Sequence, residues 1–165
     1  MSQNLKEKVL SSEMHAVGEG RRTATISPAR VAEFDDRIRL ALHAAVDKKA
    51  IDLTVLDLRG VATFTDYFII ATGANKRQMQ AVADEIVEQL KRRGSPAARV
   101  EGYRAAEWIL IDYGDFIVHV FDTKSRRFYD LEYLWREAKR SDVLPELIDS
   151  QLSGKTETES SLKEG

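Results

Sequence analysis

The chain has 165 residues, 43% of them hydrophobic, and its formal net charge is −2 because 27 Asp and Glu residues outnumber 25 Lys and Arg residues. The length predicts one domain, and the near-neutral charge matches bare nucleic acid poorly, so direct sequence-specific binding of nucleic acid is not expected. The absence of cysteine excludes disulfides, thiolate nucleophiles and cysteine-ligated zinc or iron–sulfur sites.

No segment of the sequence predicts contact with a membrane. No apolar run approaches the ~20 residues that a membrane helix needs, and the amino terminus lacks the apolar segment of a signal peptide. We therefore expect a cytoplasmic protein whose partner is a protein or a small molecule.

The two ends of the chain have little apolar surface to bury. Residues 1–27 are polar, glycine-dotted and weakly periodic, and they predict a flexible amino-terminal extension with at most a helical turn around Leu5 and Val9. Residues 141–165 end in the low-complexity stretch SGKTETESSLKEG. So polar a segment cannot offset its ordering entropy, which predicts a mostly disordered carboxy-terminal tail. The domain is therefore expected over residues 28–140.

The first half of the domain predicts a helix followed by two strands. The helix is expected to begin at Ser27, a good N-cap followed by proline, and to end near Lys49, where cations suit the carbonyl end. Its apolar residues recur at helical spacing: Val31, Phe34, Ile38, Ala41, Leu42 and Ala45. Residues 51–58 and 66–73 are apolar at successive positions, which is typical of interior strands covered on both faces.

The second half predicts a helix, three strands and a short helix. Residues 75–94 give the clearest helix, since Asn75 and Gln78 make a capping-box pattern and Gly94 suits the position after its end. The later elements are a strand at 97–103, a hairpin at 108–122 and a short helix at 129–138 with Asp130 as N-cap. The order α-β-β-α-β-β-β-α predicts a compact single α/β domain with a mixed sheet of about five strands flanked by helices.

The hairpin WILIDYGDFIVHVFD has two unlike faces, because side chains alternate along a strand. A two-residue turn at Tyr113-Gly114 or at Gly114-Asp115 puts the same residues on each face. One face is wholly apolar and is expected in the core: Ile109, Ile111, Phe116, Val118 and Val120. The other face is mixed and is expected to be partly exposed, with Asp115 at the turn: Trp108, Leu110, Asp112, Ile117, His119 and Phe121.

Two rings on the mixed face, those of Trp108 and His119, each allow two interpretations. Trp108 is either a core tryptophan or a partly exposed interface anchor, of the kind that costs ~2 kcal/mol or more when truncated. His119 is more typical of a half-buried histidine that donates to a carbonyl or an acid than of a proton-transfer group. The hairpin itself carries no nucleophile that His119 could activate.

The charged residues near the hairpin also allow two interpretations. Asp112 and Asp115 flank the turn, and they are either turn-forming acids or ligands that hold Mg²⁺ together with a phosphate. Arg126 and Arg127 form a small basic step that is more typical of a solvated edge than of a binding patch.

Four motifs together resemble the ribosomal silencing factor family, also called Iojap-related. They are T-D-x-F-I-I-A-T-G at 65–73, W-x-L-x-D-Y-G-D at 108–115, V-H-V-F at 118–121 and Y-D-L-E-x-L-W at 129–135. The resemblance runs in order over about residues 30–138. It implies a fold like that of nucleotidyltransferases but a non-enzymatic activity, with no catalytic residue, metal ligand or cofactor.

The resemblance further implies the partner and the contact residues. Family members bind the large ribosomal subunit through the ribosomal protein numbered fourteen and block association with the small subunit, which represses translation under nutrient limitation. Carried over by position, the partner-binding residues are Trp108, Leu110, Asp112, Asp115, His119, Tyr129 and Leu131.

Two further expectations stand beside this one. A small mixed sheet leaves an edge strand and apolar helix surface, which favours pairing into a homodimer. The alternative function is a metal-dependent nucleotide-binding or nucleotidyltransferase-like enzyme that uses Asp112 and Asp115.

Overall fold

The computed structural model describes residues 4–11, 23–25 and 31–148. The helices are α1 Leu5–Leu10, α3 Asp36–Asp47, α4 Lys76–Arg92, α5 Thr123–Tyr129 and α6 Leu131–Leu134. The strands are β1 Thr23–Thr25, β2 Ile51–Asp57, β3 Tyr67–Thr72, β4 Arg99–Glu101, β5 Trp108–Asp112, β6 Phe116–Phe121 and β7 Lys139–Val143. Within these ranges, none of the helices combines the length and apolar content that crossing a bilayer requires.

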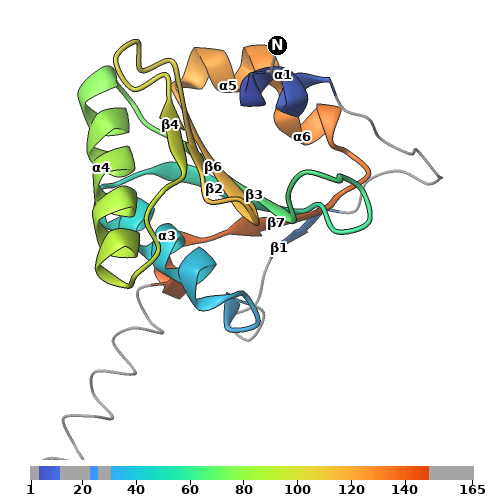
Figure 1. Ribbon diagram of the computed structural model, residues 1–165, viewed down its shortest axis with the longest axis horizontal. Coiled ribbons are helices and arrows are strands. Elements are labelled where there is room, and N and C mark those ends of the chain that lie inside the picture. The colour runs from blue at the N-terminus through green and yellow to red at the C-terminus, as the bar shows by residue number, and fades with distance from the viewer. Residues whose placement is uncertain (1–3, 12–22, 26–30, 149–165) are drawn as a thin grey trace, which may run out of the picture.

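One mixed sheet organises the fold (Figure 1). Its described strands run in the order β1-β7-β2-β3-β6-β5-β4. The pairs β3–β6 and β1–β7 are parallel, and the other neighbours are antiparallel. The predicted α/β domain with a mixed sheet is confirmed, but the sheet has seven described strands rather than about five. Strand β1 was missed because it has only three residues, and β7 because its sequence KRSDV is polar at four of five positions.

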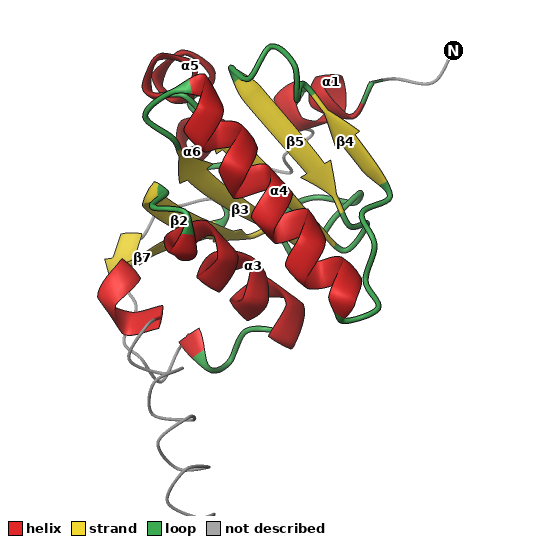
Figure 2. Cartoon of the chain, turned by 90° about the vertical axis from the view of Figure 1, so that its left-hand side faces the viewer, coloured by secondary structure: helices red, strands yellow, loops and turns green. Residues whose placement is uncertain are grey.

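Both faces of the sheet are covered. Helices α3 and α4 lie side by side over one face, as Figure 2 shows, and bury the larger core cluster against it. Helices α1, α5 and α6 lie over the opposite face (Figure 1), which we call the three-helix face. The buried residues of this second cluster are Leu5, Val9, Leu56, Leu58, Phe68, Ile70, Trp108, Leu110, Ile117, Phe121, Leu131, Trp135 and Ala138.

Helix α4 forms as its capping signals predict. The Asn75 side chain accepts a hydrogen bond from the Gln78 backbone N–H at 2.8 Å. At the other end Gly94 has φ +80°, a left-handed conformation that glycine adopts without steric cost. Its apolar stripe is buried: Met79, Val82, Ala83, Ile86 and Leu90.

Helix α3 begins later than predicted. Its N-cap is Asp35, whose carboxylate accepts a hydrogen bond from the Arg37 N–H at 2.8 Å, and a turn at residues 32–34 precedes it. A continuous helix to Lys49 is therefore wrong, and the predicted start at Ser27 lies outside the described residues. Apolar spacing alone could not locate this break, because Val31 and Phe34 still pack against the same core as α3.

Some described elements lie outside the predicted domain of residues 28–140. Helix α1 and strand β1 fall inside the predicted flexible extension, residues 1–27, and β7 crosses the predicted boundary at residue 140. The short helix after Asp130 ends at Leu134 rather than at residue 138. Residues 149–165, most of the predicted disordered tail, lie outside the described part of the chain.

Candidate functional site

The β5–β6 hairpin has one of the two predicted registers. Asp112 pairs with Ile117, and the Tyr113 N–H donates to the Phe116 carbonyl, so Gly114-Asp115 is the turn. The division into faces is confirmed. The residues Ile109, Ile111, Phe116, Val118 and Val120 belong to the core under α3 and α4. The residues Trp108, Leu110, Ile117 and Phe121 belong to the cluster on the three-helix face.

The predicted exposure of the mixed face is wrong. Trp108 is only 4% exposed, and Leu110, His119 and Leu131 are buried. The cause is the covering of this face by α1, α5 and α6, of which α1 lies about a hundred residues earlier in the chain. In this conformation these four predicted contact residues do not reach a partner.

Trp108 and His119 form a buried pair. The Trp108 Nε1–H donates to His119 Nδ1 at 3.0 Å, and the imidazole meets the Phe68 ring edge-on at 4.5 Å between centroids. Burial lowers the pKa of His119 to about 3, and the charge of Lys6 adds to the effect. The imidazole is therefore neutral with its proton on Nε2, for which the described residues supply no acceptor. We expected His119 to be half-buried and to donate a hydrogen bond. In the structure it is fully buried and accepts one through Nδ1.

Folding stability should depend on pH through His119. The unfolded chain takes up this proton near pH 6.5, whereas the folded chain resists it down to about pH 3. The unfolded state therefore binds more protons as the pH falls, and stability that is fully present above pH 6.5 is lost between pH 6.5 and pH 3. We expect the parent to lose roughly 1 kcal/mol more than His119→Asn between pH 7.5 and 5.5 in urea titrations. Equal losses would contradict a proton-free imidazole in the folded state.

The turn acids have structural partners. Asp112 Oδ1 accepts the Gly114 N–H at 2.8 Å, and Asp115 pairs with Arg37 from the first turn of α3. This is the turn-forming interpretation. Nowhere in residues 4–11, 23–25 and 31–148 do three or more His, Asp or Glu side chains gather as a metal site. The described residues thus supply no third protein ligand for a Mg²⁺ ion held by Asp112 and Asp115.

Two exposed aromatic side chains lie over the three-helix face, and neither was singled out from the sequence. Phe128 of α5 is 78% exposed and Tyr133 of α6 is 57% exposed. Phe128 contacts the half-buried Tyr129 at 5.0 Å between ring centroids, and Tyr129 in turn packs on Trp108 at 4.6 Å. We call Phe128, Tyr129 and Tyr133 the aromatic patch. Helix α5 was not predicted, and without it the outward direction of Phe128 could not be derived.

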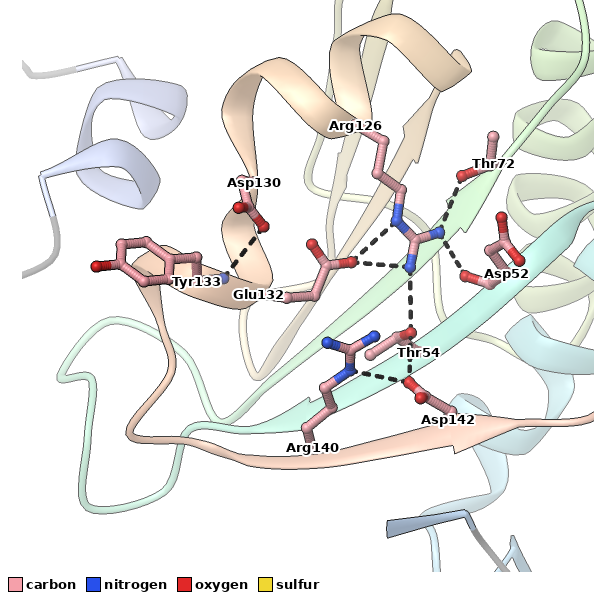
Figure 3. Close-up of polar contacts among 9 residues, drawn as sticks. All are labelled: Asp52, Thr54, Thr72, Arg126, Asp130, Glu132, Tyr133, Arg140 and Asp142. Carbon is pink, nitrogen blue, oxygen red and sulfur yellow. Dashed lines mark hydrogen bonds and ion pairs between the residues drawn. The ribbon is translucent and has the colours of Figure 1, made fainter. Parts of the chain in front are cut away.

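Arg126 fixes α5 and α6 to the sheet (Figure 3). Its guanidinium donates to the Glu132 carboxylate at 2.8 and 2.9 Å, to Thr72 Oγ1 at 2.9 Å and to Thr54 Oγ1 at 3.1 Å. It also donates to the Asp52 carbonyl. Asp52 has φ +53° in an irregular stretch of β2, which turns this carbonyl toward the arginine. The interpretation of Arg126 as a solvated edge is wrong, because its side chain is only 13% exposed.

The Arg126 network lines an open cavity of about 570 Å³. All five N–H groups of a guanidinium can donate, and five contacts engage Arg126 here. The nearby Arg140 is likewise held by Asp142 at 2.9 Å. Charges of both signs therefore neutralise one another around the cavity, and the network positions the helices rather than offering free donors to a ligand.

Strand β4 forms one edge of the sheet and carries a second exposed apolar patch. Val100 of β4 and Tyr103, which follows the strand, are both exposed, and the Tyr103 hydroxyl donates to Asp84 of α4 at 3.0 Å. An edge strand with apolar side chains is a surface on which a second chain can pair. The homodimer stays a prediction.

Comparison with known proteins places the chain among ribosomal silencing factors. The family model described as "Ribosomal silencing factor during starvation" matches residues 31–164. The ribosomal silencing factor RsfS of Bacillus subtilis (strain 168) is 40% identical over 106 residues, which are 64% of this chain and 90% of that protein. The chloroplastic protein Iojap of Zea mays is 33% identical over 95 residues, 58% of this chain and 41% of its own length.

Solved structures agree with this match. A crystal structure of a protein from Chromobacterium violaceum superposes with a TM-score of 0.58 at 33% identity and covers 67% of this chain and 87% of its own. A crystal structure of a protein from Bacillus halodurans gives 0.55 at 41% identity, with 59% and 91% covered. The predicted resemblance is confirmed over most of the described residues, and the chain belongs to the ribosomal silencing factor family.

Proposed function

We propose that this protein acts in the cytoplasm by binding the large ribosomal subunit through the ribosomal protein numbered fourteen. Bound there, it blocks association with the small subunit and so represses translation under nutrient limitation. The observation that carries the proposal is the family match over residues 31–164, because the family description names the silencing of ribosomes during starvation.

A steric mechanism suits the chemistry of the described residues. Asp112 and Asp115 make contacts within the fold at the hairpin turn, and His119 is buried and neutral. Occluding a surface requires only apolar anchors with a polar rim and enough contact area, about 1,200–2,000 Å² in total for a specific complex. No group has to transfer a proton or hold a metal for the protein to block a surface sterically.

The three-helix face is the proposed docking surface. Phe128 and Tyr133 project from it with most of their ring surface exposed, and exposed aromatic side chains are typical binding anchors. Among the residues carried over from the family motifs, Tyr129 lies at the surface beside Phe128. Trp108, Leu110, His119 and Leu131 lie beneath and support it.

The aromatic patch provides the test. Phe128→Ala and Tyr133→Ala should each weaken co-sedimentation with purified large ribosomal subunits by about thirtyfold, the effect of losing ~2 kcal/mol of anchor contact. The free energy of unfolding should change by less than about 0.5 kcal/mol, because both side chains are exposed. Val100→Ala, whose side chain lies on the α4 side of the sheet rather than on the three-helix face, is the matched control and should bind like the parent. Parent-like binding of both aromatic variants would contradict this docking surface.

A further inference from the structure

No backbone–backbone hydrogen bond joins helix α1 and its two capping residues to the other described residues, so each described contact that holds it on the three-helix face involves a side chain. Leu5 and Val9, one helical turn apart, are buried in the cluster of that face. Between them Lys6 donates from Nζ to the Trp108 carbonyl at 2.8 Å and stands 4.8 Å from the centroid of the Trp108 ring. The Trp135 Nε1–H donates to the Val9 carbonyl at 2.8 Å.

The surface under α1 has the features of a site for a peptide segment. The Trp135 indole N–H and the Trp108 carbonyl, both of which bond to α1, provide one donor and one acceptor that flank the apolar cluster. Gly102 keeps room for the cation: its φ is +79°, and a Cβ there would lie 2.1 Å from the Trp108 carbonyl oxygen and 2.7 Å from Lys6 Nζ. An apolar surface with a few oriented polar groups is the usual chemistry of recognition.

Helix α1 is also a short addition to the family domain. It has six residues, far fewer than the ~12–15 that an isolated helix needs to be even marginally stable in water, so its helical state depends on docking. It precedes residue 31, where the family match begins. The matched domain therefore contains the surface beneath α1 but not α1 itself.

We infer that α1 is a displaceable internal occupant of the docking surface, and that it competes with the ribosomal partner. This inference rests on the proposed function. The partner segment supplies what α1 supplies, namely two apolar side chains about one helical turn apart and a cation between them. Trp108 is then a contact residue only after α1 leaves. When α1 occupies the surface in about 90% of the molecules, the apparent affinity for the partner is about tenfold weaker than that of a domain from which α1 has been released.

Substitutions in the full-length chain test the competition. Val9→Ser removes a buried contact of α1, whereas Leu10→Ser changes an exposed side chain of the same helix and is the matched control. Large ribosomal subunits purified from Bacillus subtilis serve as the probe. We expect Val9→Ser to bind about tenfold more tightly than the parent and Leu10→Ser to bind equally. Circular dichroism checks that each variant is folded.

Opening is measured independently of binding by indole fluorescence. The chain has two tryptophans, Trp108 and Trp135, and both touch α1. Release of α1 should therefore shift their emission to longer wavelength in Val9→Ser, and a synthetic peptide of residues 1–12 should lower the affinity of that variant for the subunits.

The possible outcomes separate this inference from the proposed function. A red-shifted Val9→Ser variant that binds no more tightly than a binding-competent parent overturns the inference and leaves the proposed function standing. So does a folded Lys6→Ala, Val9→Ser double variant with unchanged emission and affinity, because α1 is then not displaceable by loss of its contacts. If neither the parent nor any variant binds the subunits, the proposed function fails and the inference falls with it.

Discussion

Replacing Trp108 with alanine should lower the free energy of unfolding by about 3–5 kcal/mol, the usual cost of truncating a buried aromatic side chain. The indole packs against Phe121 and Tyr129 with ring centroids 5.2 and 4.6 Å apart, and it satisfies the buried Nδ1 of His119. The variant loses this packing and leaves the imidazole nitrogen without its donor. Chemical denaturation followed by far-UV circular dichroism measures the loss.

Trp108→Phe is the control for the polar part of this effect. It keeps most of the ring volume but cannot donate to His119, so it should cost about 1–3 kcal/mol. A Trp108→Ala variant as stable as the parent would contradict the buried position of the indole. The prediction also affects binding assays, because weaker subunit binding by Trp108→Ala is expected from unfolding alone and does not identify a direct contact.

Replacing Arg126 with methionine should cost about 3 kcal/mol of unfolding free energy. Glu132, which the guanidinium contacts twice, is itself buried and would be left as an unpaired charge. Removing one partner of a buried ion pair typically costs 3–5 kcal/mol, and the lower value is expected because 13% of the arginine side chain is still exposed. Thr54, Thr72 and the Asp52 carbonyl lose their donor as well.

A neighbouring arginine provides the matched control. Arg140 makes one ion pair, with Asp142, and both side chains are more exposed than those of Arg126 and Glu132. Arg140→Ala should therefore cost less than about 1 kcal/mol. Adding Glu132→Leu to Arg126→Met should recover part of the lost stability, since it removes the uncompensated charge. Similar losses for the two arginine variants would contradict the role of Arg126 in fixing α5 and α6.

Sequence patterns predicted the elements that local physics determines. The capping side chain of Asn75 and the left-handed Gly94 delimit α4 as expected. The successive apolar positions of β2 and β3 correspond to strands covered on both sides. Alternation along the hairpin sorted its side chains correctly into two faces. These features depend on spacings of two to four residues, which a single sequence displays directly.

The features that the sequence did not reveal depend on distant contacts. The mixed hairpin face is covered by α1, α5 and α6, and Leu5 and Val9 of α1 pack there from about a hundred residues earlier in the chain. Strand β7 has a polar sequence, and it is a strand because β2 and β1 supply its backbone partners. Arg126 resembles a surface residue until Thr54, Thr72 and Glu132 are brought around it.

The proposed occlusion of the large subunit is tested most directly by sucrose-gradient sedimentation of purified small and large ribosomal subunits under associating Mg²⁺ concentrations. With the protein in excess, we expect the peak of joined ribosomes to fall, the free subunit peaks to rise, and the protein to migrate with the large subunit alone. The Phe128→Ala, Tyr133→Ala double variant should leave the joined peak intact. An unchanged peak of joined ribosomes at a protein concentration that saturates the large subunits would contradict the account.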